Sequence, residues 1–208
     1  MAENIHPIFD TILSTDQKET LLGQKSCVVW MVGLSGSGKS TLARALENAL
    51  HERGFLTALL DGDNLRTGLN NNLGFSEEDR TENIRRAAEA ARLLAGNGVI
   101  TICSLISPLN SIREMARTII GDKYVEVFID CPLEVCESRD VKGLYAKARK
   151  GLIPNFTGID SPFEAPGNAD VVVKTAEQTL EQSLNELIDG ILPRISSAAA
   201  NAGNPLGS

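Results

Sequence analysis

The sequence contains no long apolar run and few aromatic residues. Its 208 residues are 42% hydrophobic, which suits one globular domain with a sizeable core, but only 4% aromatic. No stretch approaches the roughly eighteen consecutive apolar residues of a membrane-spanning helix. The N-terminus, MAENIHPIFD, lacks the basic and then apolar regions of a secretory signal peptide. We therefore expect no membrane partner and a cytoplasmic location.

An excess of basic charge and a metal-like cysteine spacing are also absent. The net charge is −7 at pH 7, which argues against a nucleic-acid partner, because such binding depends on many contacts from Lys or Arg to phosphate. An anionic small molecule can still bind through a local basic cluster. The cysteines show no CxxC spacing and mostly stand in apolar stretches, which favours buried free thiols over a disulfide or metal site. They are Cys27, Cys103, Cys131 and Cys136.

Strand-like and helix-like stretches alternate along the chain. Apolar runs predict strands at 26–32, 55–60, 99–104, 124–130 and 170–175. Periodicity and capping residues predict helices at 15–22, 39–53 and 77–95. Pro108 and Pro132 should each begin a further helix, and Thr175 with Gln178 should cap the last one. This alternation predicts an α/β fold with three layers, in which helices cover both faces of a doubly wound, mostly parallel sheet.

Residues 140–168 interrupt the alternation. They are rich in glycine, proline and basic residues and lack the pattern of a packed element. A segment this long inside a compact domain is often a lid. We therefore divide the chain into an N-terminal extension with a short helix (1–24), a main domain (25–194) that carries the lid, and a small, polar, disordered tail (195–208).

The stretch GLSGSGKS matches the phosphate-loop pattern G-x-x-x-x-G-K-[ST] and lies between a predicted buried strand and a helix, as the motif requires. In such a loop backbone N–H groups surround the phosphates, Lys39 bridges them, and the Ser40 hydroxyl binds Mg²⁺. This predicts a P-loop NTPase type of fold. The residues assigned to ATP are Gly33, Leu34, Ser35, Gly36, Ser37, Gly38, Lys39, Ser40 and Thr41. The chain length, the lid and the absence of an NKxD guanine motif favour a small-molecule kinase, which works by positioning and charge neutralisation.

A second polar cluster, DGDNLR, follows the predicted strand 55–60. Ligands of doubly wound folds bind at the carboxyl ends of strands, so Asp61 and Asp63 should lie near the phosphate loop. If a helix begins at about residue 64, Asp63 and Arg66 can share a face, where one accepts a proton and the other pairs with an anion. A metal site and a simple helix N-cap are equally compatible with these acids. The stretch alone leaves the three roles open.

Three more side chains are candidates for an anionic, aromatic ligand. Arg80 and Asn83 are three residues apart near the start of the helix 77–95, so both can project toward one spot. Arg80 offers a guanidinium fork for phosphate or sulfate, although the spacing alone favours a solvated helix face. Phe75, just before this helix, is either a core residue or a stacking platform.

Five segments together resemble a known family. GLSGSGKST, LDGDNLRTGLNNNLGFSEEDRTENIRR, ISP, RDVKGLY and FTGIDSPFEAP occur in the order and at the spacing of the motifs of adenylylsulfate (APS) kinases, over about residues 18–190. The resemblance implies transfer of the γ-phosphoryl group of ATP to the 3′-hydroxyl of adenosine 5′-phosphosulfate (APS). The products would be ADP and 3′-phosphoadenosine 5′-phosphosulfate (PAPS), which places the chain in sulfate assimilation.

The resemblance also implies residue roles. Asp63 matches the acid beside the 3′-hydroxyl, Asp61 a neighbouring acid linked to Mg²⁺ together with Ser40, and Arg139 a residue near the adenine of ATP. The residues implied to bind APS are Asp63, Arg66, Phe75, Arg80, Asn83, Ile106, Ser107, Lys142 and Phe156. Ser107 is described in bacterial members as carrying a phosphoryl group, so the implied catalytic set is Asp63, Asp61, Lys39 and, as a phosphoserine, Ser107. Direct in-line transfer needs no such intermediate.

The chain departs from the family in one loop, and other readings stay open. Leu109 and Asn110 stand where many bacterial members have an aromatic residue or His followed by Arg, whereas Arg113 still matches. The family implies a homodimer and allows functional coupling to an ATP sulfurylase. The alternatives are a related kinase of another small acceptor, such as a nucleoside monophosphate or gluconate, and a nucleotide-binding module without catalysis. The intact Lys39 and Asp63 argue against the latter.

Overall fold

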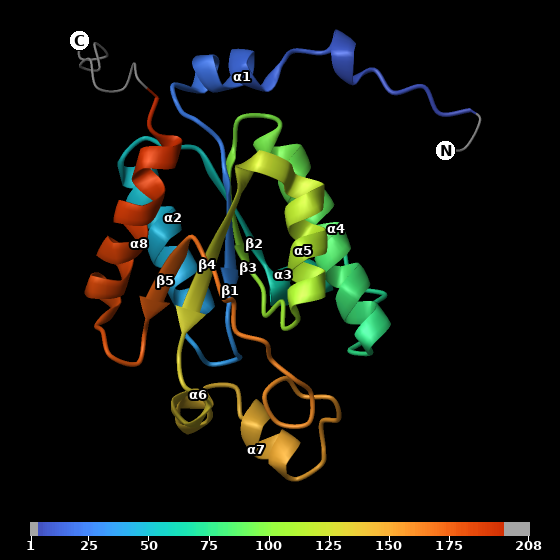
Figure 1. Ribbon diagram of the computed structural model, residues 1–208, viewed down its shortest axis with the longest axis vertical. Coiled ribbons are helices and arrows are strands. Elements are labelled where there is room, and N and C mark those ends of the chain that lie inside the picture. The colour runs from blue at the N-terminus through green and yellow to red at the C-terminus, as the bar shows by residue number, and fades with distance from the viewer. Residues whose placement is uncertain (1–3, 198–208) are drawn as a thin grey trace.

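The three-layer α/β architecture predicted from the sequence is confirmed by a computed structural model, which describes residues 4–197. Five strands form one sheet in the order β2-β3-β1-β4-β5, and every neighbouring pair is parallel. Helices α2 and α8 cover one face, and α4 and α5 cover the other (Figure 1). The elements are η1 Phe9–Thr11, α1 Thr15–Leu22, β1 Val28–Val32, α2 Lys39–Glu52, β2 Thr57–Asp61, α3 Gly62–Thr67, α4 Glu77–Ala95, β3 Ile100–Ser104, α5 Asn110–Ile120, η2 Gly121–Lys123, β4 Tyr124–Asp130, α6 Leu133–Arg139, α7 Leu144–Arg149, β5 Val171–Lys174 and α8 Leu180–Ile195.

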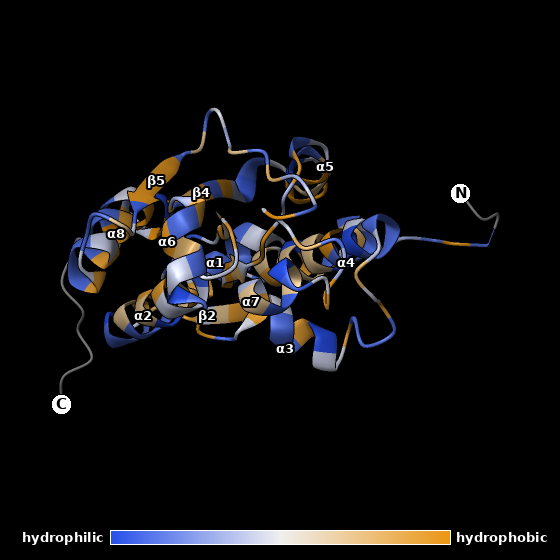
Figure 2. Cartoon of the chain, turned by 90° about the horizontal axis from the view of Figure 1, so that it is seen from below, coloured by the Kyte–Doolittle hydropathy of each residue, from blue (hydrophilic) through white to orange (hydrophobic). Residues whose placement is uncertain are grey.

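The central strand β1 explains why the sheet is covered on both faces. All five of its residues are buried, and successive side chains of a strand point to opposite faces. Val29 and Met31 therefore join the core beneath α2 and α8, whereas Val28, Trp30 and Val32 join the core beneath α4 and α5. In Figure 2, β2 and β5 carry hydrophobic colours, and the helices around the sheet carry hydrophilic residues on their outer turns.

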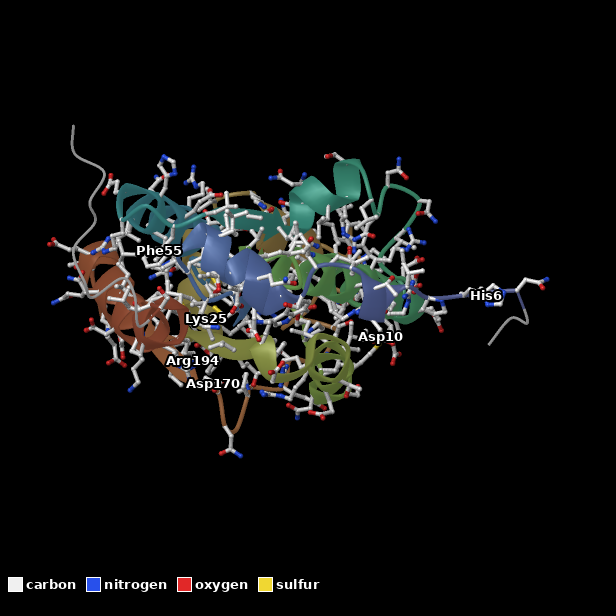
Figure 3. The ribbon with its side chains drawn as sticks, turned by 90° about the horizontal axis from the view of Figure 1, so that it is seen from above. His6, Asp10, Lys25, Phe55, Asp170 and Arg194 are labelled. Atoms are coloured by element: carbon white, nitrogen blue, oxygen red, sulfur yellow. The ribbon has the colours of Figure 1, made fainter. Side chains whose placement is uncertain are left out.

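The N-terminal extension lies at the end of the sheet opposite α6 and α7 (Figures 1 and 3). Helix α1 has the predicted bounds, because Ser14 and Gln17 form a capping box and Gly23 ends the helix in the left-handed conformation. Glu19 of this helix is 3% exposed and forms ion pairs with Lys25 at 2.9 Å and Lys123 at 2.8 Å. This buried pairing fixes α1 to the main domain.

Two predicted helix starts are wrong. Helix α5 begins at Asn110 rather than Pro108, with Leu109 as its N-cap, because Ser107 adopts a positive φ of 46° and its hydroxyl accepts a hydrogen bond from Trp30 instead of capping a helix. Helix α8 begins at Leu180, where Thr179 and Gln182 form the capping box that was expected at 175–178. The hydroxyl of Thr175 donates to the Ser37 carbonyl instead.

The remaining differences concern helix α3, the lid segment (residues 140–168) and the tail. Helix α3 begins at Gly62, two residues before the predicted start, and the lid segment contains the short helix α7, although no packed element was expected there. The prediction of four buried free thiols is confirmed. Ile195 ends α8 and Ser196 bridges to Gln24, while the predicted tail from residue 198 lies outside the described residues. Across residues 4–197, no helix has both the length and the apolar character needed to cross a membrane.

Candidate active site

The candidate site residues lie at the carboxyl ends of the strands. All strands are parallel, so the segments that follow β1, β2, β3 and β4 begin at the same edge of the sheet. The phosphate loop follows β1, the DGD sequence lies at the end of β2, and the loop with Ser107 follows β3. Helix α6 follows β4, and the lid segment with α7 comes next, at the bottom of Figure 1. The topology therefore brings together motifs that are far apart in sequence, from the phosphate loop at residues 33–40 to the FTGIDSPFEAP stretch at 156–166.

In the ligand-free phosphate loop, the lysine contacts the loop itself. The Lys39 ammonium group is buried and donates hydrogen bonds to the carbonyl oxygens of Gly33 at 2.8 Å and Leu34 at 2.6 Å. Burial lowers the pKa of Lys39 from 10.5 to about 8, because removal from water disfavours the charged form. A Cβ at Gly36 would come within 2.8 Å of the Cys136 carbonyl oxygen, so only glycine fits where the loop meets α6.

Two oxygen-bearing side chains meet at the start of α2. The Ser40 hydroxyl donates to Asp61 Oδ2 at 2.7 Å and lies 3.2 Å from the hydroxyl of Ser104. Asp61 Oδ1 accepts from the backbone N–H of Asp63 at 3.0 Å, so Asp61 is also the N-cap of α3. Hydroxyl and carboxylate oxygens are suitable ligands for Mg²⁺. Among the described residues no group of three or more His, Cys, Asp or Glu side chains could hold a metal ion, so an ion here would need water or phosphate oxygens as well.

Asp63 is the more accessible of the two acids. Its carboxylate forms an ion pair with Lys142 of the lid segment, and 72% of the Asp63 side chain and 60% of the Lys142 side chain are exposed. Asp63 has no role as a helix cap, whereas Asp61 has one. The structure thus separates two acids that the sequence leaves equivalent, and it joins the lid segment to the end of β2.

Two arginines contact Phe75, one through its ring and one through its backbone carbonyl. The Arg66 guanidinium lies 4.3 Å from the ring centroid and donates to the carbonyl of Gly74 at 2.9 Å. Arg80 donates to the Phe75 carbonyl at 3.0 Å. Burial lowers the pKa of both guanidinium groups, but arginine keeps its charge in proteins. Phe75 is 64% exposed, so the ring is stacked on one side only and has room for a second flat partner.

Arg80 also reaches the lid segment. It donates to Thr157 Oγ1 at 2.7 Å and to the Asn155 carbonyl, on either side of Phe156. The same side chain therefore holds the two segments that carry Phe75 and Phe156. Phe156 is half-buried, and its ring meets the ring of Tyr145 edge to face at a centroid distance of 5.0 Å.

Asn83 is placed differently from what its predicted role suggests. It is 6% exposed, and its Oδ1 accepts a hydrogen bond from Asn70 at 3.0 Å. Asn70 Oδ1 is a buried polar atom without a hydrogen-bond partner in the described chain. Asn83 therefore supports the turn that follows α3.

Ser107 is enclosed. It is 1% exposed, and its hydroxyl accepts a hydrogen bond from the indole N–H of Trp30 at 3.0 Å. Its carbonyl accepts from Arg113 at 2.8 Å, and Arg113 also donates to the carbonyl of Glu164 at the end of the lid segment, at 2.8 Å. Asn110, one of the departures from the family pattern, accepts a hydrogen bond from the same guanidinium. Ile106, next to Ser107, is half-buried.

The phosphate loop is also held from the side of β5 and α6. Arg139 donates to the carbonyl of Thr175 at 2.7 Å and, more weakly, to that of Gly36 at 3.4 Å. Thr175 donates to the carbonyl of Ser37 at 2.7 Å. Sequence analysis assigned Thr175 to a helix cap and not to this contact, because a threonine after a short strand is more often a cap.

A cavity of about 480 Å³ lies between the phosphate loop and the lid segment. Its lining residues are Leu34, Leu133, Gly158, Ile159, Asp160, Ser161, Pro162 and Phe163. Phe163 and Tyr145 were not among the predicted site residues, although both lie within the quoted motifs. An aromatic residue in such a motif does not reveal whether it contacts a ligand or the protein.

Comparisons with known proteins give a consistent result. Residues 25–174 match a family described as adenylylsulphate kinase. The chain is 58% identical to the adenylyl-sulfate kinase of Bacteroides thetaiotaomicron over 193 residues, which are 92% of this chain and 96% of that protein. It is also 58% identical to the adenylyl-sulfate kinase of Bacteroides fragilis over 194 residues, 93% of this chain and 96% of that protein. The structure of the Mycobacterium tuberculosis APS kinase in complex with AMPPNP and APS is similar with a TM-score of 0.78 and 47% identity, over 81% of this chain and 98% of that one.

Proposed function

The chain belongs to the adenylylsulphate kinase family, and on this premise we propose that it transfers the γ-phosphoryl group of ATP to the 3′-hydroxyl of APS, giving PAPS and ADP. One observation carries the proposal. The phosphate loop, the accessible carboxylate of Asp63 and the pair formed by Arg66 and Phe75 lie at one edge of the sheet. Phosphoryl transfer depends on placing donor and acceptor together, and this edge offers groups for both.

The donor half of the site is suited to a triphosphate. The Lys39 ammonium contacts the carbonyls of Gly33 and Leu34. With ATP bound it would turn to the β- and γ-phosphates, whose negative charges compensate its positive charge better than neutral carbonyls do. Ser40 Oγ and Asp61 Oδ2 would hold Mg²⁺, and the ion would neutralise phosphate charge when bound. Arg139 would lie against the adenine of ATP.

The acceptor half is suited to a sulfated nucleotide. Asp63 accepts a hydrogen bond or a proton from the 3′-hydroxyl, since Asp61 is already engaged by Ser40 and by the N-terminus of α3. Arg66, Arg80 and Lys142 neutralise the phosphosulfate, while Phe75 and Phe156 stack on the adenine from two segments that Arg80 holds. Asn83, Ile106 and Ser107 complete this pocket.

Direct transfer from ATP to APS suits the enclosed position of Ser107. A phosphoryl group on Ser107 Oγ would displace the hydrogen bond from Trp30, and Ser107 as a whole is 1% exposed. A mechanism in which the acceptor hydroxyl attacks ATP in line needs no such rearrangement. The phosphoserine that the family resemblance implies stays a prediction, which mass spectrometry of the protein after incubation with ATP alone would test.

Three further properties belong to the same proposal. The enzyme acts in the cytoplasm, forms a homodimer, and uses APS supplied by an ATP sulfurylase. Exposed apolar side chains on the N-terminal extension, such as Ile8, Phe9 and Leu13, are compatible with a protein interface. Light scattering during gel filtration would measure the mass, and a monomer at micromolar concentration would contradict the homodimer.

The decisive experiment is a coupled assay of ADP release with different acceptors. We expect turnover with APS and turnover lower by at least about 100-fold with AMP, since AMP lacks the sulfate that the arginines recognise. A kinase of another small acceptor, the main alternative, would prefer AMP or gluconate in the same panel. Equal or higher activity with AMP than with APS would reject the proposed function.

A further inference from the structure

Tyr145 connects the phosphate loop to the lid segment. Its hydroxyl donates a hydrogen bond to the carbonyl of Ser35 at 2.8 Å, and its ring contacts the ring of Phe156 edge to face. The side chain is 1% exposed. One end of this rigid residue therefore touches the segment that holds ATP, and the other touches an aromatic residue of the acceptor pocket.

The loop end of this contact adjoins two carbonyls that Lys39 contacts. The carbonyls of Gly33 and Leu34 accept the Lys39 ammonium in the ligand-free chain. Ser35 directly follows these two residues, so a change in the Lys39 contacts on phosphate binding would reach the peptide whose carbonyl accepts the Tyr145 hydroxyl. The Leu34 side chain lies beside Gly158 of the lid segment, where an added Cβ would come within 3.1 Å of it. Two consecutive residues of the loop thus contact the lid segment.

At its lid end, Tyr145 contacts Phe156, one of the residues proposed to bind the acceptor. Phe156 lies between Asn155, whose carbonyl accepts from Arg80, and Thr157, whose hydroxyl accepts from the same guanidinium at 2.7 Å. Arg80 in turn donates to the Phe75 carbonyl at 3.0 Å. A displacement of the Tyr145 ring would therefore shift Phe156 and, through the hydrogen bonds of Arg80, also Phe75.

The local sequence holds Tyr145 firmly. The Asp140 carboxylate accepts hydrogen bonds from the backbone N–H groups of Tyr145 and Ala146, both at 3.0 Å, and so supports the first turn of α7. Gly143 enters the helix with a φ of 65°, a conformation that favours glycine. The ring then packs with Leu34, Cys131 and Cys136. A side chain fixed at so many points transmits a movement rather than absorbing it.

We propose that Tyr145 is a positioning residue that couples the two substrate sites, so that each bound substrate raises the affinity for the other. The inference rests on the proposed function, because it requires that APS occupies the pocket that contains Phe75 and Phe156. By thermodynamic linkage the coupling factor is the same in both directions.

Titration calorimetry tests the proposal with two matched variants. The affinity for APS is measured with and without AMPPNP, which permits no transfer, and the ratio of the two dissociation constants is the coupling factor. Tyr145→Phe removes only the hydroxyl. We expect this variant to reduce the coupling factor by about 3- to 10-fold, to a value closer to one, because one neutral hydrogen bond contributes an effect of this size. Tyr124→Phe is the control, since it also removes a buried hydroxyl, one that donates to Glu126 at the amino end of β4 and not to the phosphate loop. It should leave the factor unchanged.

The outcomes separate the inference from the proposed function. If the wild-type chain binds AMPPNP but not APS, both are overturned. If APS binds and the coupling factor is one, or is equally affected by both variants, only the role of Tyr145 is overturned.

A second measurement, fluorine NMR, tests the proposal on the wild-type chain. The chain has two tyrosines, so 3-fluorotyrosine labelling gives two fluorine resonances, which Tyr124→Phe assigns. We expect the Tyr145 resonance to shift with AMPPNP alone and with APS alone. A Tyr145 resonance that responds to neither ligand, or to only one, would overturn the proposal.

Discussion

ATP affinity should depend on pH through Lys39, and the structure gives the size of the effect. In the ligand-free chain the pKa of Lys39 is about 8, because the ammonium group is buried. Bound phosphates favour the charged form, so the pKa in the complex lies far above 8. Binding then takes up a proton above pH 8. At pH 9 only about one tenth of the free protein carries the charge, so the dissociation constant should be about tenfold higher than at pH 7.

The assay is calorimetric titration with AMPPNP between pH 7 and 9.5 at fixed Mg²⁺ and ionic strength. The second phosphate ionisation has a pKa near 6, so it is about nine tenths complete at pH 7 and essentially complete above pH 8. Lys39→Arg is the control, because a guanidinium stays charged over this range. The affinity of this variant for AMPPNP should be independent of pH, whatever its absolute value. An affinity of the wild-type chain that is constant from pH 7 to 9.5 would refute the buried, partly deprotonated Lys39.

Three other predictions concern single side chains. Asp63→Asn should lower kcat by roughly 10² to 10⁴-fold in a single-turnover assay with little change in AMPPNP affinity, whereas an equal loss for both properties would remove Asp63 from the acceptor step. Arg66→Lys should raise KM for APS by roughly tenfold and leave KM for ATP unchanged, because lysine replaces a flat guanidinium that stacks on Phe75; a larger effect on ATP would contradict this role. Burial raises the pKa of Glu19, but hydrogen bonds from Lys123, Lys25 and Ser26 outweigh burial and lower the pKa from 4.5 to about 2, so Glu19→Gln should reduce the free energy of unfolding by about 3 kcal/mol in urea at pH 7. In the wild-type chain this contribution is complete above pH 4.5 and is lost as the pH falls toward 2, and a variant as stable as wild type would show that α1 is not held by these charges.

In the ligand-free site the polar groups satisfy one another. Lys39 contacts its own loop, Ser40 contacts Asp61, and Lys142 contacts Asp63. Lys39 is buried, so its contacts with the loop carbonyls offset the cost of removing its charge from water, whereas Ser40, Asp63 and Lys142 are exposed. Substrate binding exchanges them for phosphate, metal and hydroxyl partners, which makes affinity depend on the difference between two sets of hydrogen bonds.

Several parts of the site were readable from the sequence because they are local. The phosphate loop is a contiguous motif between a strand and a helix, and Asp61 and Asp63 directly follow a strand. The sequence did not predict the contacts of three other residues, Arg113, Thr175 and Tyr145. Each contacts the site through a backbone carbonyl of a distant segment, namely those of Ser107, Ser37 and Ser35. A backbone carbonyl is present at every residue, so no side-chain pattern marks such a contact.

The two corrected helix starts have a similar origin. Pro108 and Thr175 have the local preferences of a helix terminus. At both places long-range contacts prevail, since Ser107 accepts from Trp30 and Thr175 donates to Ser37. Local preferences amount to about 1 kcal/mol, so one tertiary hydrogen bond can reverse them.

The sequence by itself determined the α/β class, the strand positions, the phosphate loop and the family, because these follow from short periodic patterns and contiguous motifs. Tertiary structure decided the separate roles of Asp61 and Asp63, the enclosure of Ser107 and the contact of Tyr145 with both halves of the site. These properties depend on which carbonyls, rings and charges meet across the ends of parallel strands. That meeting is set by the packing of the whole sheet and cannot be read from any one segment.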